Sequence, residues 1–520
     1  MSLRCFIAAA AFLFASESAF ANEKSGKAQH VVVLVWDGMR PDFVTDQNTP
    51  TLATLTREGV VFKNNRAAFP SSTNVNGVVL ATGCEPAHNS VIANQEYRAE
   101  IDPHKPFDTS DFPALDRDET FTSKFVSVPT VAEIVRQAGF RTAIAGSKPV
   151  AQLINRSRLR ETEAERESIV IYRGRVLPAN TQAGLTAAVG PFPKRKGLPN
   201  DQEDDWTTRA LTQFLWKKDV PKFSLLWLSE PDLSEHETAP GSPTSIAAIK
   251  SSDANLAKVL AALKAKKALT NTDLIVVSDH GFSTVDLAID AAALLRAAGF
   301  DAVREFPDKP PAGQILVATL GGSIGLYVVN HDQKVIEKLV EFLQRSEFAG
   351  VILTQKAQAG TFALEQAQMN TPTAPDVVAA CRWNNQPNKF GVAGQIASDI
   401  GRKVGEGTHS TFSPHDMNNT LIASGPDFRR GWTDETPTGN IDVAPTILWI
   451  LGLEAPQRMD GRILSEALVD SATPPSITEK TLEAQRDLGD ATWRQHLRTA
   501  TVAGVTYLME GNGGRQKKEP

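Results

Sequence analysis

The sequence contains little cysteine and no long apolar run beyond its first residues. Only three cysteines occur among 520 residues, at Cys5, Cys84 and Cys381. If the leader that carries Cys5 is removed, at most one disulfide can form. A Cys84–Cys381 bridge and two buried free thiols then remain as alternatives, because sequence gives no distance between them.

The absence of long hydrophobic segments excludes a membrane-spanning helix after the leader. The leader itself has Arg4, an apolar core over residues 5–15 and a small-residue cleavage site at 19–21. This pattern predicts a signal peptide over residues 1–21, with Asn22 as the first mature residue and a periplasmic or secreted protein. The apolar core is too short to act as a membrane anchor.

Positive charge is not in excess either. The net charge is −6 and the isoelectric point is about 5.9, which argues against nucleic-acid binding as the main activity. No internal repeat or coiled-coil heptad occurs, so solenoid and fibrous architectures are not indicated. The length suits one large α/β domain with insertions, or two domains.

Apolar runs that end abruptly in polar residues dominate what is present. Residues 273–281, DLIVVSDHG, show the clearest case, and residues 31–35 and 223–228 repeat it. Such runs are typical of buried parallel strands, whose carboxyl ends form the ligand-binding edge of an open sheet. With helices expected at 130–138, 244–266 and 442–451, the pattern predicts a doubly wound, mainly parallel α/β sheet with helices on both faces.

The rest of the chain is divided by changes in this pattern. We expect a catalytic α/β core over 22–285, a smaller α+β insert over 286–395, and a second part of the core over 396–473. The charged, Gly- and Pro-rich residues 155–204 suggest an insertion or mobile covering loop. The polar residues 474–520 suggest a C-terminal extension whose last part, 511–520, is disordered.

Four strand ends or loops carry potential metal ligands. Three carboxylates and three imidazoles suffice for two zinc-like ions with positions left open for substrate. Taken singly, each residue has an ordinary structural explanation as a cap, turn or loop residue; their joint occurrence favours a metal site. The predicted ligands are Asp37, Asp232, His236, Asp279, His280 and His409.

Thr73 is the predicted nucleophile, at a turn that opens a helix. A helix N-terminus favours an anion, and a nearby cation lowers the pKa of a hydroxyl group. Asn76, one turn later, is a candidate hydrogen-bond donor to a phosphoryl oxygen. Alone, Thr73 and Asn76 would be read as helix-cap residues.

The order of these motifs resembles the alkaline phosphatase superfamily, and within it the nucleotide pyrophosphatase/phosphodiesterase family. The residues that carry the resemblance are Asp37, Thr73, the D-x-x-x-H at 232–236, the S-D-H-G at 278–281 and the G-x-H at 407–409. It spans about residues 31–464 and includes Pro86 and Asn94 after the nucleophile segment.

The resemblance implies a ligand set and a mechanism. Asp232, His236 and His409 would hold one zinc; Asp37, Asp279 and His280 would hold the second, with Thr73 facing both. Thr73 would form a phosphothreonine intermediate, and Asn76 would match the family's phosphate-binding asparagine. The implied partner is a small phosphodiester or nucleotide.

The sequence departs from the family where an aromatic-proline pair usually follows the nucleophile, because Asn74-Val75 stands there instead. Nucleobase recognition is therefore not implied. Ser410 also replaces the glycine that usually follows the last ligand. Exact substrate, metal identity and oligomeric state are not determined by these patterns.

Three other functions remain as alternatives. A phosphomonoesterase or phosphonate hydrolase would use the same two-metal site. A sulfatase is disfavoured because the Thr73 segment lacks the C/S-x-P-x-R context. A degenerate binding scaffold would be expected to have lost ligands or the nucleophile, and all seven residues are present.

Overall fold

The computed structural model describes residues 26–115, 125–156, 162–469 and 475–518. The predicted signal peptide therefore lies outside the described residues, and export stays a prediction. In the described part, helices that combine the length and the apolar composition of a membrane span are absent.

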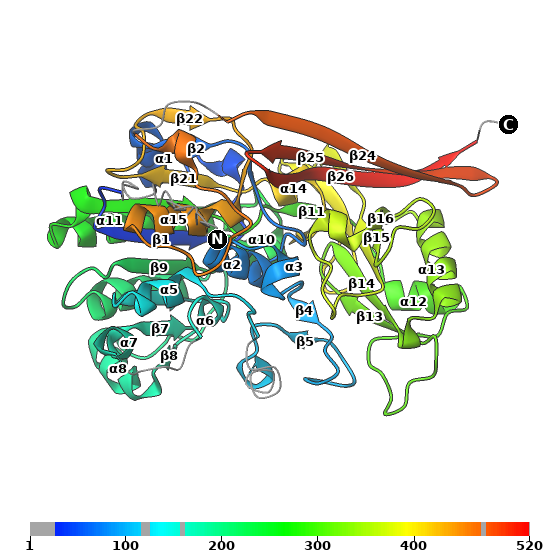
Figure 1. Cartoon of the computed structure of the whole chain (residues 1–520), viewed down its shortest axis with the longest axis horizontal. Helices are drawn as coiled ribbons and strands as arrows, with labels where there is room; N and C mark the ends of the chain where they lie inside the picture. Colours follow the sequence, from blue (N-terminus) through cyan, green and yellow to red (C-terminus); the bar gives the residue numbers. More distant parts are fainter. Residues whose placement is uncertain (1–25, 116–124, 157–161, 470–474, 519–520) are drawn as a thin grey trace, which may run out of the picture.

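A nine-stranded sheet forms the centre of the molecule (Figure 1). Five strands from β10 to β7 run parallel, and antiparallel or short strands close both edges. In spatial order the strands are β22 (Trp432–Asp434), β2 (Val60–Phe62), β21 (Leu421–Ser424), β10 (Thr272–Val277), β1 (His30–Trp36), β9 (Phe223–Leu228), β6 (Thr142–Gly146), β7 (Ile169–Tyr172) and β8 (Arg175–Leu177).

The central strands are apolar on both faces because each face has its own core. Alternate residues of β1 contribute to two separate apolar clusters, with Val33 in one and Leu34 in the other. The first cluster includes residues of α2 (Thr73–Thr82), α5 (Val131–Gln137) and α15 (Val443–Leu451); the second includes α1 (Pro50–Glu58) and α11 (Pro243–Ala265). Helices thus cover both faces, as predicted.

The insert contains further sheets beside the main one, at the right of Figure 1. A six-stranded sheet has the order β12 (Ala302–Val303), β13 (Ile315–Thr319), β14 (Ser323–Val328), β17 (Val377–Cys381), β15 (Ala349–Thr354) and β16 (Phe362–Ala363). It packs with α12 (Ala291–Ala297) and α13 (Gln333–Arg345). A four-stranded sheet combines β18 (Trp383–Pro387), β19 (Ala393–Ser398), β11 (Ser283–Ala288) and β20 (Gly407–Thr408). The exact domain boundaries stay a prediction.

Two expectations were wrong. Residues 155–204 are not a covering loop: their described part includes β7, β8, α7 (Glu163–Glu167), α8 (Gln182–Val189) and the start of α9 (Asp201–Arg209). The short apolar run at β7 extends the main sheet next to β6. The charges of this region obscured it, because charged residues stand on both sides of that run, in α7 and at Arg173 and Arg175.

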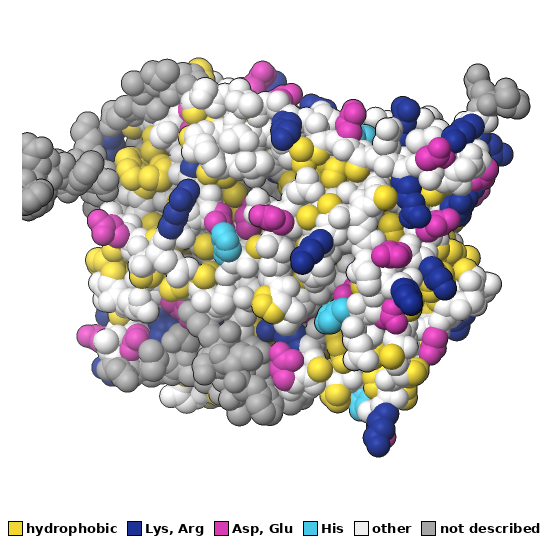
Figure 2. All heavy atoms as spheres, turned by 45° about the vertical axis from the view of Figure 1, so that its right-hand side comes forward, with side chains coloured by type: hydrophobic (Ala, Val, Ile, Leu, Met, Phe, Trp, Pro, Cys, Tyr) yellow, Lys and Arg dark blue, Asp and Glu magenta, His cyan; other side chains and the backbone are white. Residues whose placement is uncertain are grey.

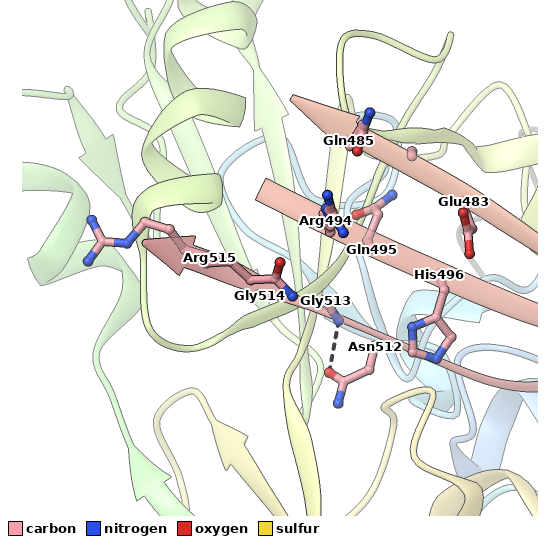
Figure 3. Close-up of a pocket in the computed structure, with 11 residues that line it drawn as sticks. Glu483, Gln485, Arg494, Gln495, His496, Asn512, Gly513, Gly514 and Arg515 are labelled. Atoms are coloured by element: carbon pink, nitrogen blue, oxygen red, sulfur yellow. Dashed lines mark hydrogen bonds between the residues drawn. The ribbon is translucent and has the colours of Figure 1, made fainter. Parts of the chain in front are cut away.

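Residues 511–517 are not disordered either. The extension forms a three-stranded sheet of β24 (Ile477–Asp487), β25 (Ala491–Val502) and β26 (Val505–Lys517). In β25, buried Trp493 and Leu497 alternate with more exposed residues, so one face packs on the insert. Polar side chains of this three-stranded sheet line a groove (Figure 3). Arg494 and His496 of the groove come from β25, and Arg515 comes from β26.

Surface charges and both cysteines fit an ordinary globular protein. On the face drawn in Figure 2, described basic and acidic side chains are interspersed over the insert and the C-terminal sheet. Cys84 and Cys381 are buried free thiols and form no disulfide with each other. Of the two alternatives for these cysteines, the structure therefore has the pair of free thiols. Burial raises the pKa of Cys84 to about 11.

A buried carboxyl pair lies at the amino end of β10, the edge opposite the predicted site. Burial and the neighbouring Asp427 raise the pKa of Asp273 to about 9. Asp427 itself accepts the backbone N–H groups of Lys27 and Ala28 at 2.6 and 2.8 Å. The folded protein therefore keeps a proton on Asp273 that the unfolded chain releases near pH 4.

This proton makes stability depend on pH. Between about pH 4 and pH 9 the folded state binds more protons than the unfolded state, so stability falls as the pH rises. We expect Asp273→Asn to raise the melting temperature by several °C at pH 8.5, with a difference that shrinks towards pH 4. Calorimetry across this range measures it, with exposed Asp46→Asn as the control. A pH-independent difference would contradict the shared proton.

Candidate metal centre

Three adjacent strands deliver carboxylates to one edge of the main sheet. β10, β1 and β9 lie side by side in parallel register, with Val35 opposite Val277 and Trp36 opposite Leu228. Asp37 follows β1, Asp279 follows β10 and Asp232 follows β9 at the start of α10 (Asp232–Thr238). Chain segments that are far apart in sequence therefore meet at the carboxyl edge, where open α/β sheets bind ligands.

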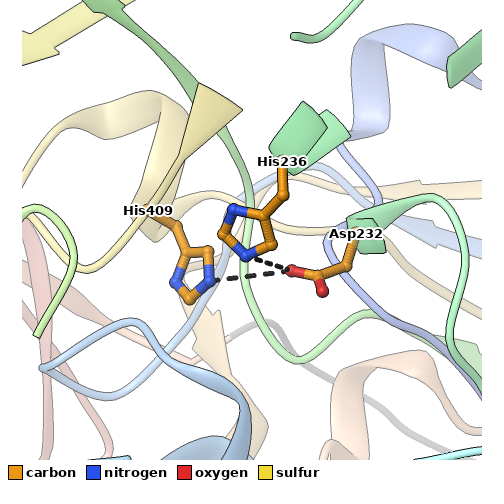
Figure 4. A group of neighbouring side chains, drawn as sticks. All are labelled: Asp232, His236 and His409. Carbon is orange, nitrogen blue, oxygen red and sulfur yellow. Dashed lines mark ion pairs between the residues drawn. The ribbon is translucent and has the colours of Figure 1, made fainter. Parts of the chain in front are cut away.

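The first group of ligands consists of Asp232, His236 and His409. The i, i+4 spacing on α10 places Asp232 and His236 on one face of the helix, with Oδ1 of Asp232 3.2 Å from Nε2 of His236. His409 follows β20 and brings its Nε2 to 3.6 Å from the same oxygen. Figure 4 shows both rings directed at Asp232. The three side chains fit a common ion.

The second group surrounds His280. Its Nε2 lies 3.3 Å from Asp279 Oδ2, 3.6 Å from Asp37 Oδ1 and 4.0 Å from Asp232 Oδ1. Asp37, Asp232 and His280 also have the spacing of a metal site, so Asp232 stands between the two groups. All six residues predicted as ligands thus come together.

Unpaired oxygens and oriented imidazoles fit metal ions. Within the described residues, the buried Oδ1 atoms of Asp37 and Asp232 and the Oδ2 of Asp279 accept no hydrogen bond. A buried polar atom left unpaired is costly, so these three oxygens are suited to cations. Each imidazole pairs its Nδ1 with a backbone carbonyl, at 2.7 Å for His409, 2.9 Å for His280 and 3.0 Å for His236. This leaves each Nε2 for a metal, the usual arrangement of ligating histidines.

The electrostatics of the two groups point the same way. Burial and the neighbouring Asp279 hold the pKa of Asp37 well above its usual range. Burial and the rings of His280 and His236 hold the pKa of His409 well below its usual range. The neutral imidazole is the form that binds metal, and divalent cations would offset the repulsion between the buried carboxylates.

Thr73 faces this centre from the first residue of α2. Its Oγ1 lies 3.3 Å from His280 Nε2, and the side chain is buried. Ser72 precedes it as the helix N-cap residue, so the hydroxyl lies where the helix dipole favours negative charge. Thr73 also lines a cavity of about 450 Å³ with Asp232, His236 and His409.

Asn76 does not line this cavity. Its amide is fully buried, with Oδ1 accepting the N–H of Ala68 at 2.8 Å and Nδ2 donating to the Ala68 carbonyl at 3.1 Å. The cavity is lined instead by Asn94, whose Oδ1 accepts the N–H of Asn74 at 2.8 Å. That bond leaves the Nδ2 donor of Asn94 for a ligand. Asn94 carried no predicted role, although its segment contributed to the resemblance.

The Asn74-Val75 departure also has a structural counterpart. Asn74 lines the cavity and donates its Nδ2 to Thr109 Oγ1 at 3.0 Å, and Val75 is packed in an apolar cluster. Among the described residues that line the cavity there is no phenylalanine, tyrosine or tryptophan. Ser410 adopts a φ of 85°, in the left-handed region that favours the glycine usual at this position.

Lys148 is a residue of the centre that the sequence analysis missed. It follows β6, the neighbour of β9, and places its Nζ 2.9 Å from Asp37 and 2.8 Å from Asp232. Burial acts to lower the pKa of Lys148, but the charges of Asp232, Asp37 and Asp279 outweigh it and raise the pKa. One feature of the sequence could have indicated Lys148: residues 142–146 are a further apolar run, and Ser147-Lys148 follows directly at its end.

The sequence and the structure both match known proteins. Residues 31–389 match the family described as type I phosphodiesterase / nucleotide pyrophosphatase. Human ectonucleotide pyrophosphatase/phosphodiesterase family members 7 and 5 are each 23% identical, over 268 and 255 residues. These alignments cover 51% and 49% of this chain and 50% and 45% of the relatives, so the chain spans about half the length of the human relatives it matches.

Solved structures share the fold. Murine ectonucleotide pyrophosphatase / phosphodiesterase 5, as an inactive variant in complex with AMP, superposes with a TM-score of 0.59 at 18% identity. The human protein of the same name gives 0.58 at 16% identity. Each comparison covers 85% of this chain and 100% of the other. The predicted alkaline-phosphatase-like α/β architecture is thereby confirmed.

Proposed function

Because the chain belongs to the type I phosphodiesterase / nucleotide pyrophosphatase family, we propose that it hydrolyses phosphodiester or phosphoanhydride bonds with Thr73 as nucleophile. The observation that carries the proposal is the position of Thr73 Oγ1, at a helix start and 3.3 Å from His280 within the ring of predicted ligands. The substrate class of a small phosphodiester or nucleotide is taken from the family.

Two divalent ions, which we propose to be zinc, would be held by Asp232, His236 and His409 and by Asp37, Asp279 and His280. When bound, they supply Lewis-acid stabilisation of the phosphoryl charge and lower the pKa of nearby hydroxyl groups. The donor set of imidazole nitrogens and carboxylate oxygens suits zinc.

The chain's own groups then carry out an in-line displacement. Thr73 Oγ1 loses its proton and forms a bond to phosphorus, while the ester oxygen on the opposite side leaves with the bonding electron pair. Water cleaves the resulting phosphothreonine and regenerates the hydroxyl. We propose that Asn94, rather than Asn76, donates its Nδ2 to a phosphoryl oxygen; its place in the lining of the cavity supports this role.

Turnover of a generic aryl phosphodiester before and after chelation tests this function. We expect hydrolysis of the diester, loss of activity on removal of the metals, and recovery when zinc is returned, because the buried carboxylates and imidazoles need cations to bind the substrate anion. The matching aryl monoester is measured beside it. Diester turnover that persists in chelator would contradict the metal-dependent proposal, and exclusive monoester turnover would make the protein a phosphatase.

A further inference from the structure

Lys148 is a cation set directly against the reacting centre, in the cavity that Thr73 lines. Its side chain is 17% exposed, and its Nζ bridges Oδ2 of Asp37 at 2.9 Å and Oδ2 of Asp232 at 2.8 Å. These two aspartates follow different strands; Asp37 belongs to the second ligand group, and Asp232 belongs to both. A single ammonium group therefore touches both halves of the centre.

The lysine and the ions use different oxygens of the same carboxylates. Lys148 contacts the Oδ2 atoms, and the Oδ2 of Asp37 also accepts Trp227 Nε1 at 2.8 Å. The Oδ1 atoms, which face the imidazoles, are the ones without a hydrogen-bond partner. Lys148 is therefore compatible with a loaded centre.

The charge that Lys148 adds decides which phosphoryl group balances the site. At the centre itself, three carboxylates, from Asp37, Asp232 and Asp279, against two divalent ions would leave one positive charge in excess. Asp108, Arg173 and Arg402 also line the cavity and lie outside this count. That excess matches a phosphodiester, which carries one negative charge. Lys148 raises it to two, which matches the doubly charged phosphoryl group of a monoester at neutral pH.

We propose that Lys148 equips the centre to bind a doubly charged phosphoryl group, so that the enzyme hydrolyses phosphomonoesters in addition to diesters. This inference rests on the proposed two-ion, Thr73-dependent hydrolase. In the added reaction Thr73 Oγ1 loses its proton to water and bonds to phosphorus, while the ester oxygen leaves with the bonding electron pair and takes up a proton from water. A second water then breaks the threonine–phosphorus bond and releases inorganic phosphate.

Substitution of Lys148 by methionine removes the charge at nearly constant length. For Lys148→Met we expect kcat/KM for an aryl monoester to fall at least about tenfold more than for the matching methyl aryl diester, because only the monoester needs the second charge. Lys148→Arg should keep the wild-type ratio. Lys258→Met, which removes a lysine paired with Asp205 on the outer surface, is the control and should change neither rate.

A binding measurement separates charge recognition from a structural role. Calorimetry of zinc-loaded protein with inorganic phosphate should show affinity reduced at least about tenfold in Lys148→Met, with zinc content equal to wild type. Equal losses on both esters with unchanged phosphate affinity would overturn the inference and leave Lys148 as a residue that only positions Asp37 and Asp232. A second outcome would also overturn the inference. In it, Lys148→Met loses zinc, and Lys148→Arg binds zinc but does not bind phosphate.

These outcomes are distinct from failure of the proposed function. If wild-type protein turns over neither ester, the hydrolase proposal fails, whereas phosphate calorimetry still decides whether Lys148 binds the dianion. If wild type is active and the monoester-to-diester ratio does not change in Lys148→Met, the lysine inference alone fails.

Discussion

Replacing Thr73 by alanine is expected to lower the turnover of an aryl phosphodiester at least about 10³-fold, because no other group would supply the attacking oxygen. Thr73→Ser keeps a hydroxyl at the start of α2 and should retain a substantial part of the activity. Initial rates on zinc-loaded wild type and variants measure the effect. Acid-quenched wild type should also carry a phosphoryl adduct on Thr73 that the alanine variant lacks.

Ser72 provides the matched control for this prediction. It lines the same cavity, one residue before Thr73, and its Oγ has no hydrogen-bond partner among the described residues. If Ser72→Ala abolished turnover and Thr73→Ala did not, the nucleophile assignment would be wrong. Diester turnover that survives both substitutions would instead indicate direct attack by water.

Asp232→Asn is expected to have the second large effect, on metal content. The Oδ1 of Asp232 lies within 4.0 Å of Nε2 atoms from His236, His409 and His280, and so belongs to both ligand groups. Loss of its charge should reduce bound zinc from about two ions per chain to one or fewer, and reduce diester turnover with it. Elemental analysis after dialysis measures the stoichiometry.

The zinc content of His409→Ala is compared with that of Asp232→Asn. His409 belongs to only one of the two groups, so this variant should keep about one ion. Full zinc content in Asp232→Asn would contradict its place between the groups. Equal zinc loss in the two variants would show that the two sites fill only together.

That the proposed metal ligands lie close together could be predicted from the sequence, because strand geometry brings their segments to one edge of the sheet. Apolar runs such as 31–35 and 274–277 are typical of buried strands, and parallel strands bring their carboxyl ends to one edge. The polar residue after each run then falls at that edge without knowledge of any contact. Helix limits could likewise be predicted from periodicity: the helix expected at residues 244–266 is α11, Pro243–Ala265.

Other features depended on information that local patterns lack. The strands of residues 477–517 have one packed and one exposed face, so their polar content resembled disorder. Asn76 turns its amide into the interior from α2, whereas Asn94 reaches the cavity from the segment between α3 (Pro86–Asn89) and β4 (Gln95–Glu96); spacing along the sequence does not determine this. Lys148 was missed because a single lysine after a strand is ordinary until the neighbouring strand is known to carry Asp232.

The ligands extend from Asp37 to His409, and β10 lies beside β1 although about 240 residues separate them. The centre is therefore built from contacts of high contact order. Long chain loops must close, at a cost in entropy, before the ligands can bind an ion. In a nascent chain that does not yet include His409, the group of Asp232, His236 and His409 is incomplete. If the centre holds ions as proposed, capture of the full set comes late in folding, and bound ions stabilise only chains whose distant segments have already met.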